Sequence, residues 1–330
     1  MKKVKLGIIG TGLAAKHLHL PALLKLQNNF EITAVCNHTE PKAKKFAKQL
    51  GGVPYYLDYK KFLKEADVEA VDIALPIDLN YQVAKDSVNS GKHVILEKPL
   101  AVNLAEAKKL VDVEKKTELV TMVAENFRYR KIFIKAKKYL EQGKIGKPYA
   151  AVWNLFNNVD EKNKYAQTEW RQNHKYPGGF MTDAGVHNIA ALRMLFGDFK
   201  EVSAFSKNIN PAIGKPDTLS VRFRTHDEAL LVFNIFFSAK GHHEDRLIIF
   251  GEKGTIEIDE NSLSIKKENG KPRVEKLTED KGYYEEFKNF YSAITKGETV
   301  LYTFADGYKD FEAAVKAIKS AEQNKKMKLS

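Results

Sequence analysis

The chain has 330 residues, a net charge of +12 and a single cysteine, Cys36. This length suits two domains better than one core. One cysteine excludes an internal disulfide and a cysteine metal cluster, and favours a reducing compartment. No stretch approaches the ~20 apolar residues of a membrane span, and the N-terminus lacks a signal-peptide pattern. We therefore expect a cytoplasmic protein that neither crosses nor binds a membrane.

The positive charge is spread along the chain rather than gathered in one basic segment. Lysines alternate with acids, as in residues 60–65 and 114–116. No basic run contains the interleaved aromatic residues of a single-strand binder. The charge pattern therefore indicates a solvated surface, and we expect a small-molecule partner and no nucleic acid.

Short apolar runs alternate with amphipathic segments over the first 123 residues. Strands are predicted over 4–9, 32–36, 70–75, 93–96 and 119–123, and helices over 13–27, 41–50, 79–90 and 104–116. Strands read as continuous apolar runs when helices cover both faces of their sheet. The pattern predicts an α/β fold that begins with a doubly wound parallel sheet, in a Rossmann domain over residues 1–123.

The periodicity changes after residue 124. Helices are predicted over 132–142, 180–196, 283–295 and 304–324, a strand over 149–156, and a polar stretch over 157–176. Residues 202–276 read as a succession of β-rich runs separated by turns. We expect a second, α+β domain over residues 124–330 with a large, mostly antiparallel sheet.

A glycine-rich loop joins the first predicted strand to the first predicted helix. It has the G-x-G-x-x-A pattern from Gly10 to Ala15. Glycines allow a tight turn and a close approach to a pyrophosphate, and the free N–H groups of the helix attract the anion. In this strand–loop–helix context we interpret the motif as dinucleotide binding rather than as a structural turn. The predicted contact residues are Gly10, Thr11, Gly12, Leu13 and Ala14.

The end of the second predicted strand bears on the choice of cofactor. Asn37 stands where NAD-specific folds carry an acid for the ribose 2′-hydroxyl. Asn37 has no charge to repel a 2′-phosphate, and His38 and Lys42 are near enough in sequence to pair with one. The alternative is that Asn37 only starts a turn. We favour NADP and leave NAD open.

Glu97, Lys98 and Pro99 follow the apolar run 93–96. In a doubly wound fold the carboxyl ends of the strands border the ligand crevice. The proline biases Lys98 toward an extended backbone. A lysine there could stabilise negative charge on a reacting oxygen, whereas the alternative is a surface lysine paired with Glu97.

The segment 178–187 contains Asp183 and His187, four residues apart in a predicted helix. They therefore share one helix face. A histidine oriented by a carboxylate is a suitable general base, because its reference pKa of about 6.5 lies near working pH. The alternative is a plain pair that stabilises the helix.

The other histidines carry weaker signals. His17 and His19, just after the glycine loop, are expected to be surface or packing residues. His242 and His243 precede two acids, but no second set of ligands at usual spacing supports a metal site. We expect no metal.

Taken together, the chain resembles the glucose–fructose oxidoreductase / inositol dehydrogenase / MocA family of NAD(P)-dependent oxidoreductases. The resemblance rests on 10–15, 91–100, 170–171 and 178–187 and spans essentially the whole chain. It implies reversible oxidation of a secondary alcohol on a sugar, sugar derivative or cyclitol. It makes Lys98 the active-site lysine, His187 the acid/base residue and Asp183 the carboxylate that positions them.

The resemblance also implies further contacts. Substrate contacts are expected at Lys98, Arg128, Trp170, Asp183 and His187, and further cofactor contacts at Leu75, Pro76, Asn80, Glu97, Lys98, Asn126 and Arg171. Two positions depart from the family pattern. Asn80 stands where many members have histidine, and Ala190 where many have aspartate. Both departures weaken inference of the substrate by analogy.

The resemblance implies a homodimer or homotetramer formed through an open C-terminal sheet. It leaves two alternatives to a dehydrogenase. One is a glycosidase that uses tightly held NAD for a transient oxidation. The other is a non-catalytic sensor of the NAD(P)H pool. The presence of Lys98, Asp183 and His187 together argues against the sensor.

Overall fold

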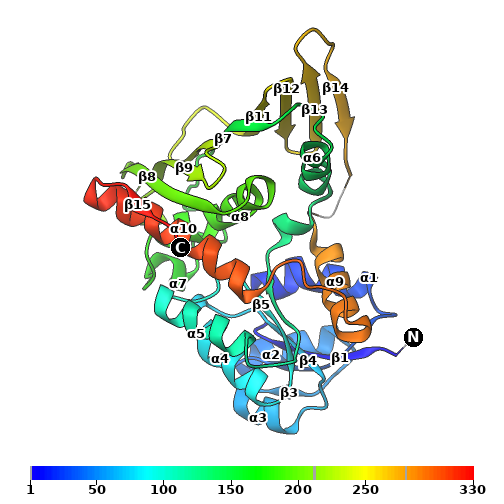
Figure 1. Ribbon diagram of the computed structural model, residues 1–330. Helices are drawn as coiled ribbons and strands as arrows, with labels where there is room; N and C mark the ends of the chain where they lie inside the picture. Colours follow the sequence, from blue (N-terminus) through cyan, green and yellow to red (C-terminus); the bar gives the residue numbers. More distant parts are fainter. Residues whose placement is uncertain (1, 211–212, 279–280) are drawn as a thin grey trace. The chain divides into compact units, whose positions relative to one another are not determined.

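The computed structural model describes residues 2–210, 213–278 and 281–330. The chain forms two compact units, and Figure 1 gives the labels of their elements. Unit 1 consists of Met1–Tyr129 and Asp280–Tyr308, and unit 2 of Arg130–Glu279 and Lys309–Ser330. The first unit therefore includes a segment from near the end of the chain. Each unit is described by itself.

Unit 1 contains a six-stranded sheet in the order β3-β2-β1-β4-β5-β6. All neighbouring strands pair in parallel. The predicted doubly wound parallel sheet is thereby confirmed, with one additional two-residue strand at its edge. The strands are β1 (Val4–Ile9), β2 (Phe30–Cys36), β3 (Tyr55–Tyr56), β4 (Ala70–Ile73), β5 (His93–Glu97) and β6 (Thr121–Ala124).

The helices of unit 1 match most of the predicted ranges. They are η1 (Ala15–His19), α1 (Leu20–Lys25), α2 (Glu40–Gln49), α3 (Tyr59–Glu65), α4 (Ile77–Asn89), α5 (Leu104–Glu114), η2 (Asn126–Tyr129) and α9 (Tyr283–Lys296). Sequence analysis missed α3, although its start carries a capping signal, since the side chain of Asp58 accepts from the Lys61 amide. The helix predicted over 13–27 begins as a π-helical turn, η1, before it continues as α1.

Helix α9 completes unit 1 and lies beside α1 in Figure 1. The ring of Phe30 stacks on Phe290 with centroids 6.3 Å apart and meets Tyr291 edge-on at 5.6 Å. The Tyr291 hydroxyl donates to the Lys2 carbonyl at 3.0 Å. An aromatic cluster therefore ties this late segment to the first two strands.

Unit 2 contains a nine-stranded sheet in the order β14-β13-β12-β11-β7-β10-β9-β8-β15. Only β7 and β10 pair in parallel among the described strands of this sheet. The prediction of a mostly antiparallel sheet is confirmed. The strands are β7 (Pro148–Phe156), β8 (Phe199–Lys207), β9 (Thr218–Thr225), β10 (Leu230–Phe236), β11 (Glu244–Gly251), β12 (Gly254–Asp259), β13 (Ser262–Lys267), β14 (Arg273–Lys276) and β15 (Met327–Lys328).

Helices cover one face of this sheet. The helices are α6 (Lys131–Glu141), α7 (Glu169–Gln172), α8 (Gly179–Phe196) and α10 (Phe304–Gln323), of which residues from Lys309 on belong to unit 2. A Cβ on Gly185 would lie 3.6 Å from Ile235 and 3.7 Å from Phe233, so α8 packs closely on β10. The opposite face holds exposed apolar residues such as Phe205 and Leu230.

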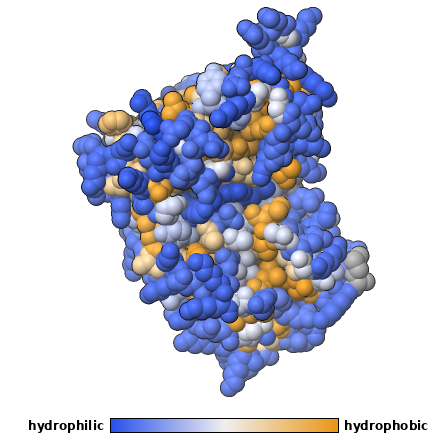
Figure 2. Space-filling view, in the orientation of Figure 1, coloured by the Kyte–Doolittle hydropathy of each residue, from blue (hydrophilic) through white to orange (hydrophobic). Residues whose placement is uncertain are grey.

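The surface is largely polar. Figure 2 shows mostly hydrophilic residues on the visible face, in keeping with the lysine-rich composition. Among the described residues, no helix has the length and apolar character needed to span a membrane.

Candidate active site

The glycine loop follows β1 and leads into η1. Gly10 has φ +100°, and a Cβ on it would lie 2.2 Å from the Ala74 carbonyl oxygen, so only glycine fits. A Cβ on Gly12 would meet nothing within 4 Å, so this side of the loop faces open space. Ala14 caps η1 without a side-chain hydrogen bond. This loop therefore fits a dinucleotide phosphate, because open space lies beside it and the first helical N–H groups have no side-chain cap.

Asn37 follows β2 and is tied to the glycine loop. Its Nδ2 donates to Thr11 Oγ1 at 2.9 Å, and its Oδ1 accepts from the Thr39 amide at 2.8 Å. The residue thus starts a turn and also anchors Thr11, which is buried. His38 and Lys42 are exposed. Asn37 thus orders the loop through bonds within the chain.

Sequence analysis overlooked a further cation beside this loop. Lys16 lies in η1, with its Nζ 5.9 Å from the centre of the Phe46 ring. Burial, together with repulsion from Lys45 and Lys42, lowers the pKa of Lys16. The position of Lys16, six residues after Gly10, was the available signal. These three lysines create a positive potential near the end of β2.

Asn80 of α4 holds the backbone on both sides of Lys98. It is 1% exposed, and its Nδ2 donates to the Glu97 carbonyl at 3.0 Å and the Pro99 carbonyl at 2.9 Å. Its buried Oδ1 has no hydrogen-bond partner among the described residues. Lys98 itself is half-buried, and its peptide bond to Pro99 is cis. An unsatisfied acceptor here fits a ligand that brings a hydrogen-bond donor.

The remaining expected contacts of unit 1 have varied surroundings. Leu75 and Pro76 lie just before α4, and Pro76 is its N-cap residue. The Asn126 side chain donates to the Lys281 carbonyl at 2.7 Å. The Arg128 guanidinium lies 5.0 Å from the centre of the Tyr302 ring. Asn126 and Arg128 therefore also bind the late segment of unit 1.

His19 is another functional candidate that the sequence did not single out. It was expected on the surface or in packing, but it is fully buried between two carboxylates. Its Nδ1 lies 2.9 Å from Asp72 Oδ2, and its Nε2 lies 3.0 Å from Glu97 Oε1. No local pattern could reveal this, because the partners lie 53 and 78 residues away in sequence.

In unit 2, Asp183 of α8 is paired with Arg171 of α7. Arg171 Nε donates to Asp183 Oδ2 at 2.7 Å, and its Nη1 donates to Thr168 Oγ1 at 3.0 Å. The side chains are only 13% and 7% exposed. The guanidinium also lies 4.0 Å from the centre of the Trp170 ring. Arg171, expected to contact cofactor, therefore orients Asp183.

Aromatic residues surround this ion pair. The Tyr176 ring lies 6.1 Å from Trp170 and 5.6 Å from His174. The Tyr176 hydroxyl is buried and has no hydrogen-bond partner among the described residues. Burial and the nearby charge of Asp183 raise its pKa. Sequence analysis did not select Tyr176, whose only signal is its place just before the Gly178–Gly179 turn.

His187 lies one helical turn after Asp183 on α8 and is half-buried, whereas Asp183 is 5% exposed. A spacing of four places both side chains on one helix face. This face therefore combines a carboxylate fixed by arginine with an accessible imidazole.

Two family models together match most of the chain. One, described as "Oxidoreductase family, NAD-binding Rossmann fold", matches residues 4–125. The other, "Oxidoreductase family, C-terminal alpha/beta domain", matches residues 137–329. The chain belongs to the Gfo/Idh/MocA oxidoreductase family. It is therefore an oxidoreductase with an NAD-binding domain, as the resemblance in sequence indicated.

Relatives of this oxidoreductase include solved and curated proteins. An oxidoreductase from Thermotoga maritima, known from a crystal structure, is 36% identical with a TM-score of 0.93, over 99% of this chain and 98% of that one. Myo-inositol 2-dehydrogenase of Thermotoga maritima is 26% identical over 99% of this chain and 98% of its own. Levoglucosan dehydrogenase of Pseudarthrobacter phenanthrenivorans is 30% identical over 62% of this chain and 54% of its own.

Within this oxidoreductase, Ala190 is fully buried on α8. An aspartate there would need a partner to offset its burial. Elsewhere, the His242 ring lies 3.3 Å from Glu244 Oε2 on the surface. Among the described residues, no group of three or more His, Cys, Asp or Glu side chains could hold a metal ion.

Proposed function

We propose that this oxidoreductase reversibly oxidises a secondary alcohol of a sugar, sugar derivative or cyclitol with NAD(P). The observation that carries the proposal is the buried Arg171–Asp183 pair, at 2.7 Å, one helical turn before the accessible His187. A fixed carboxylate beside an imidazole suits proton removal from a hydroxyl group. The relatives that act on inositol and levoglucosan support the same substrate class.

Each side chain has a separate task in the proposed reaction. The bound nicotinamide supplies the chemistry of hydride acceptance and donation. His187 takes the proton of the substrate hydroxyl at its imidazole nitrogen. Lys98 donates a hydrogen bond to the same oxygen and stabilises its developing negative charge. Asp183, held by Arg171, orients His187 and the substrate.

The substrate contacts proposed from the family are Lys98, Arg128, Trp170, Asp183 and His187. We add Tyr176, because its buried hydroxyl has no hydrogen-bond partner among the residues that the structure describes and lies close to the charge of Asp183. A sugar hydroxyl group would satisfy it as donor or acceptor. Trp170 and Tyr176 supply apolar ring surface for the C–H groups of a sugar.

We propose NADP as the preferred cofactor, held by the loop 10–14 and by Asn80. The residue after β2 is Asn37 rather than an acid, and the basic residues nearby are His38, Lys42, Lys16 and Lys45. A 2′-phosphate would relieve the mutual repulsion of these lysines. An NAD-specific site instead needs an acid for the 2′-hydroxyl. The other proposed cofactor contacts are Leu75, Pro76, Glu97, Lys98, Asn126 and Arg171.

We propose that residues 1–123 serve the cofactor, and residues 124–330 serve the substrate and oligomerisation, with 280–308 returning to the first compact unit. The uncovered sheet face supports a homodimer or homotetramer. It holds Phe205, 70% exposed, Leu230, 54% exposed, and the stacked pair Phe156–Phe236. A second copy of the chain would cover this surface. We propose a cytoplasmic location from the cysteine content.

The test is a screen of sugars and cyclitols with NADP⁺ and NAD⁺, recording absorbance of the reduced nicotinamide. Substrate-dependent reduction that is lost in His187→Ala and Lys98→Ala supports the dehydrogenase. Sugar release from glycosides without net reduction supports the glycosidase instead. Cofactor binding without turnover of any compound supports the sensor. Wild-type rates in His187→Ala would overturn the proposed roles.

A further inference from the structure

His19 occupies a position where the glycine-loop helix meets the carboxyl ends of two strands. Its ring bridges Asp72 of β4, at 2.9 Å, and Glu97 at the end of β5, at 3.0 Å. The side chains of His19 and Asp72 are fully buried, and that of Glu97 is 12% exposed. His19 closes a π-helical turn, a rare geometry that is frequent at functional sites. The three residues form a chain of contacts that ends at the neighbour of Lys98.

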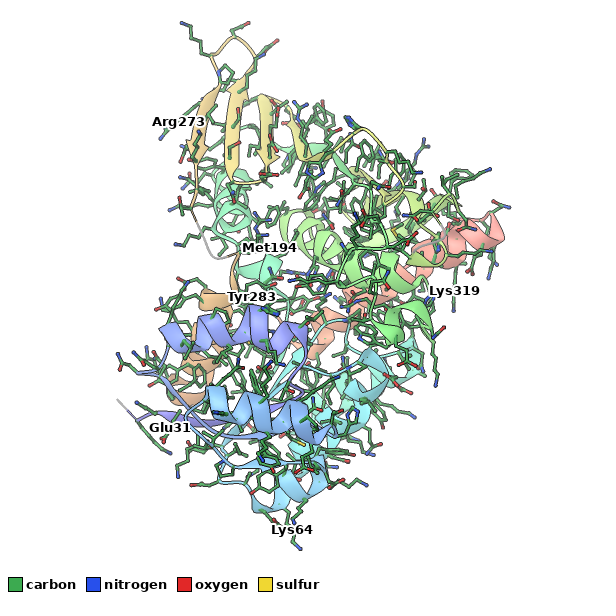
Figure 3. The ribbon with its side chains drawn as sticks, turned by 180° about the vertical axis from the view of Figure 1, so that it is seen from behind. Glu31, Lys64, Met194, Arg273, Tyr283 and Lys319 are labelled. Carbon is green, nitrogen blue, oxygen red and sulfur yellow. The ribbon has the colours of Figure 1, made fainter. Side chains whose placement is uncertain are left out.

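Helix α9 closes the other side of this cluster. The Phe287 ring meets the imidazole edge-on at 5.2 Å, and Tyr283, labelled in Figure 3, lies 6.4 Å away. Glu286, on the same helix, is fully buried, and neither of its carboxyl oxygens has a hydrogen-bond partner among the described residues. The charged and titratable groups that face His19 are therefore Asp72, Glu97, Glu286 and Tyr283.

The charges of the cluster follow from these contacts. Burial disfavours a charged ring, but the carboxylates of Asp72 and Glu97 outweigh it and hold the pKa of His19 well above its usual range. Burial, reinforced by the acids Glu97, Glu125 and Asp72, holds the pKa of Glu286 well above its usual range. These shifts favour the protonated forms of both His19 and Glu286.

Stability alone does not account for this arrangement. Replacing a buried ion pair or triad by apolar residues of similar volume is often neutral or stabilising. The cluster instead restrains one particular side chain, the Glu97 carboxylate, directly before Lys98. Asn80 restrains the carbonyls of Glu97 and Pro99. The backbone of Lys98 is therefore held from both neighbours.

We propose that His19 is a positioning residue for Lys98, acting through the Glu97 carboxylate that it holds and that Asp72 anchors from behind. This inference rests on the proposed function in its assignment of Lys98 to the reaction. His19 is not among the residues proposed to contact the cofactor or the substrate.

The experiment compares His19→Asn with His17→Asn, a matched change of an exposed histidine on the same helical turn. We expect kcat of His19→Asn to fall about 10- to 100-fold, the loss expected for a displacement of about 1 Å. KM for the sugar and Kd for NADPH should stay within about threefold, because contacts common to ground and transition states remain.

Hydrogen exchange of the segment 93–100 gives a readout that does not need turnover. Protection of this segment should fall in His19→Asn and remain in His17→Asn. Glu97→Gln keeps the shape of the side chain that contacts His19 but removes its charge. This variant replaces His19→Asn in the test if His19→Asn does not fold, and it should also lower kcat. Glu286→Gln should leave kcat unchanged, because neither carboxyl oxygen of Glu286 is hydrogen-bonded to His19 or Glu97 among the described residues.

Wild-type kcat in folded His19→Asn, or unchanged protection of 93–100, would overturn the inference. A loss of kcat equal in Glu286→Gln and His19→Asn would also overturn it, because the effect would then be general to the core. If the wild-type protein turns over no sugar or cyclitol, the proposed function fails. The exchange comparison then decides whether His19 positions the strand end.

Discussion

Arg171 and Asp183 form a nearly buried ion pair with Nε and Oδ2 2.7 Å apart. The pair fixes the carboxylate one helical turn before His187 and leaves the imidazole accessible. We expect Arg171→Lys to lower kcat/KM about 100-fold, because lysine cannot reproduce the planar fork that also reaches Thr168. Steady-state kinetics with the sugar found in the screen checks this.

Arg246→Lys is the matched control for Arg171→Lys. Arg246 Nε also lies 2.7 Å from a carboxylate, that of Glu257, but both side chains are exposed, at 43% and 38%. This change should leave kcat/KM unaffected. Equal losses in the two variants would contradict a role for the Arg171–Asp183 pair in catalysis.

Tyr176→Phe separates stability from substrate binding. The buried hydroxyl has no hydrogen-bond partner in the described part of the chain, so its removal should leave the melting temperature unchanged or raise it. KM for the sugar should rise about 3- to 10-fold, the value of one neutral hydrogen bond. Thermal unfolding and steady-state kinetics measure the two effects. A lower melting temperature with unchanged KM would show that Tyr176 only stabilises the fold.

Lys16 should contribute to the choice between NADPH and NADH. Lys16→Gln should weaken the binding of NADPH about tenfold, since a charge-assisted contact contributes about 1.5 kcal/mol. The binding of NADH should remain nearly unchanged. Fluorescence titrations at low and high salt measure both constants. Lys64→Gln, a change of an exposed residue of α3 that is labelled in Figure 3, is the control and should alter neither dissociation constant. An equal loss of affinity for NADPH and NADH in Lys16→Gln would show that Lys16 does not contact the 2′-phosphate.

Glu286 gives the folded chain a defined pH dependence. Its pKa is raised in the folded state by burial, so above the unfolded value of about 4.3 the folded chain binds the extra proton. Stability is therefore lost as pH rises from there toward the folded pKa, by at most about 1.4 kcal/mol per pH unit. The raised pKa of His19 adds a further loss of stability as pH rises above about 6.5, the pKa of histidine in the unfolded chain.

Glu286→Gln should remove the first of these two slopes. Urea unfolding between about pH 5 and pH 6.5 would then show a smaller decrease in the unfolding free energy than in the wild-type protein. Identical slopes in the two proteins would mean that Glu286 is ionised in the folded chain.

Local sequence patterns predicted most of the fold. The apolar runs and helical spacing located β1, β5, α8 and α9 to within a few residues, because these elements bury one continuous face or surface. The two-residue β3 and the short α3 were missed, since neither is long enough to show periodicity. The return of α9 to unit 1 depends on contacts such as Phe30–Phe290, between residues far apart in sequence.

The candidate site was predictable only where its chemistry is local. Gly10, Lys98 and the pair Asp183–His187 belong to compact motifs. The partner of Asp183 lies 12 residues earlier on another helix, and those of His19 lie on distant strands. No spacing rule links such residues, so the sequence did not predict that Arg171 pairs with Asp183, and His19 was expected to be a surface or packing residue.

The proposed reaction is the oxidation of a sugar or cyclitol alcohol with a nicotinamide cofactor. The most direct measurement follows deuterium from the carbinol carbon of the sugar identified in the screen to recovered NADPH or NADH, by mass spectrometry. We predict one deuterium per reduced cofactor, and none above background in His187→Ala. Reduced cofactor without deuterium, or no reduction by any sugar or cyclitol, would contradict the account.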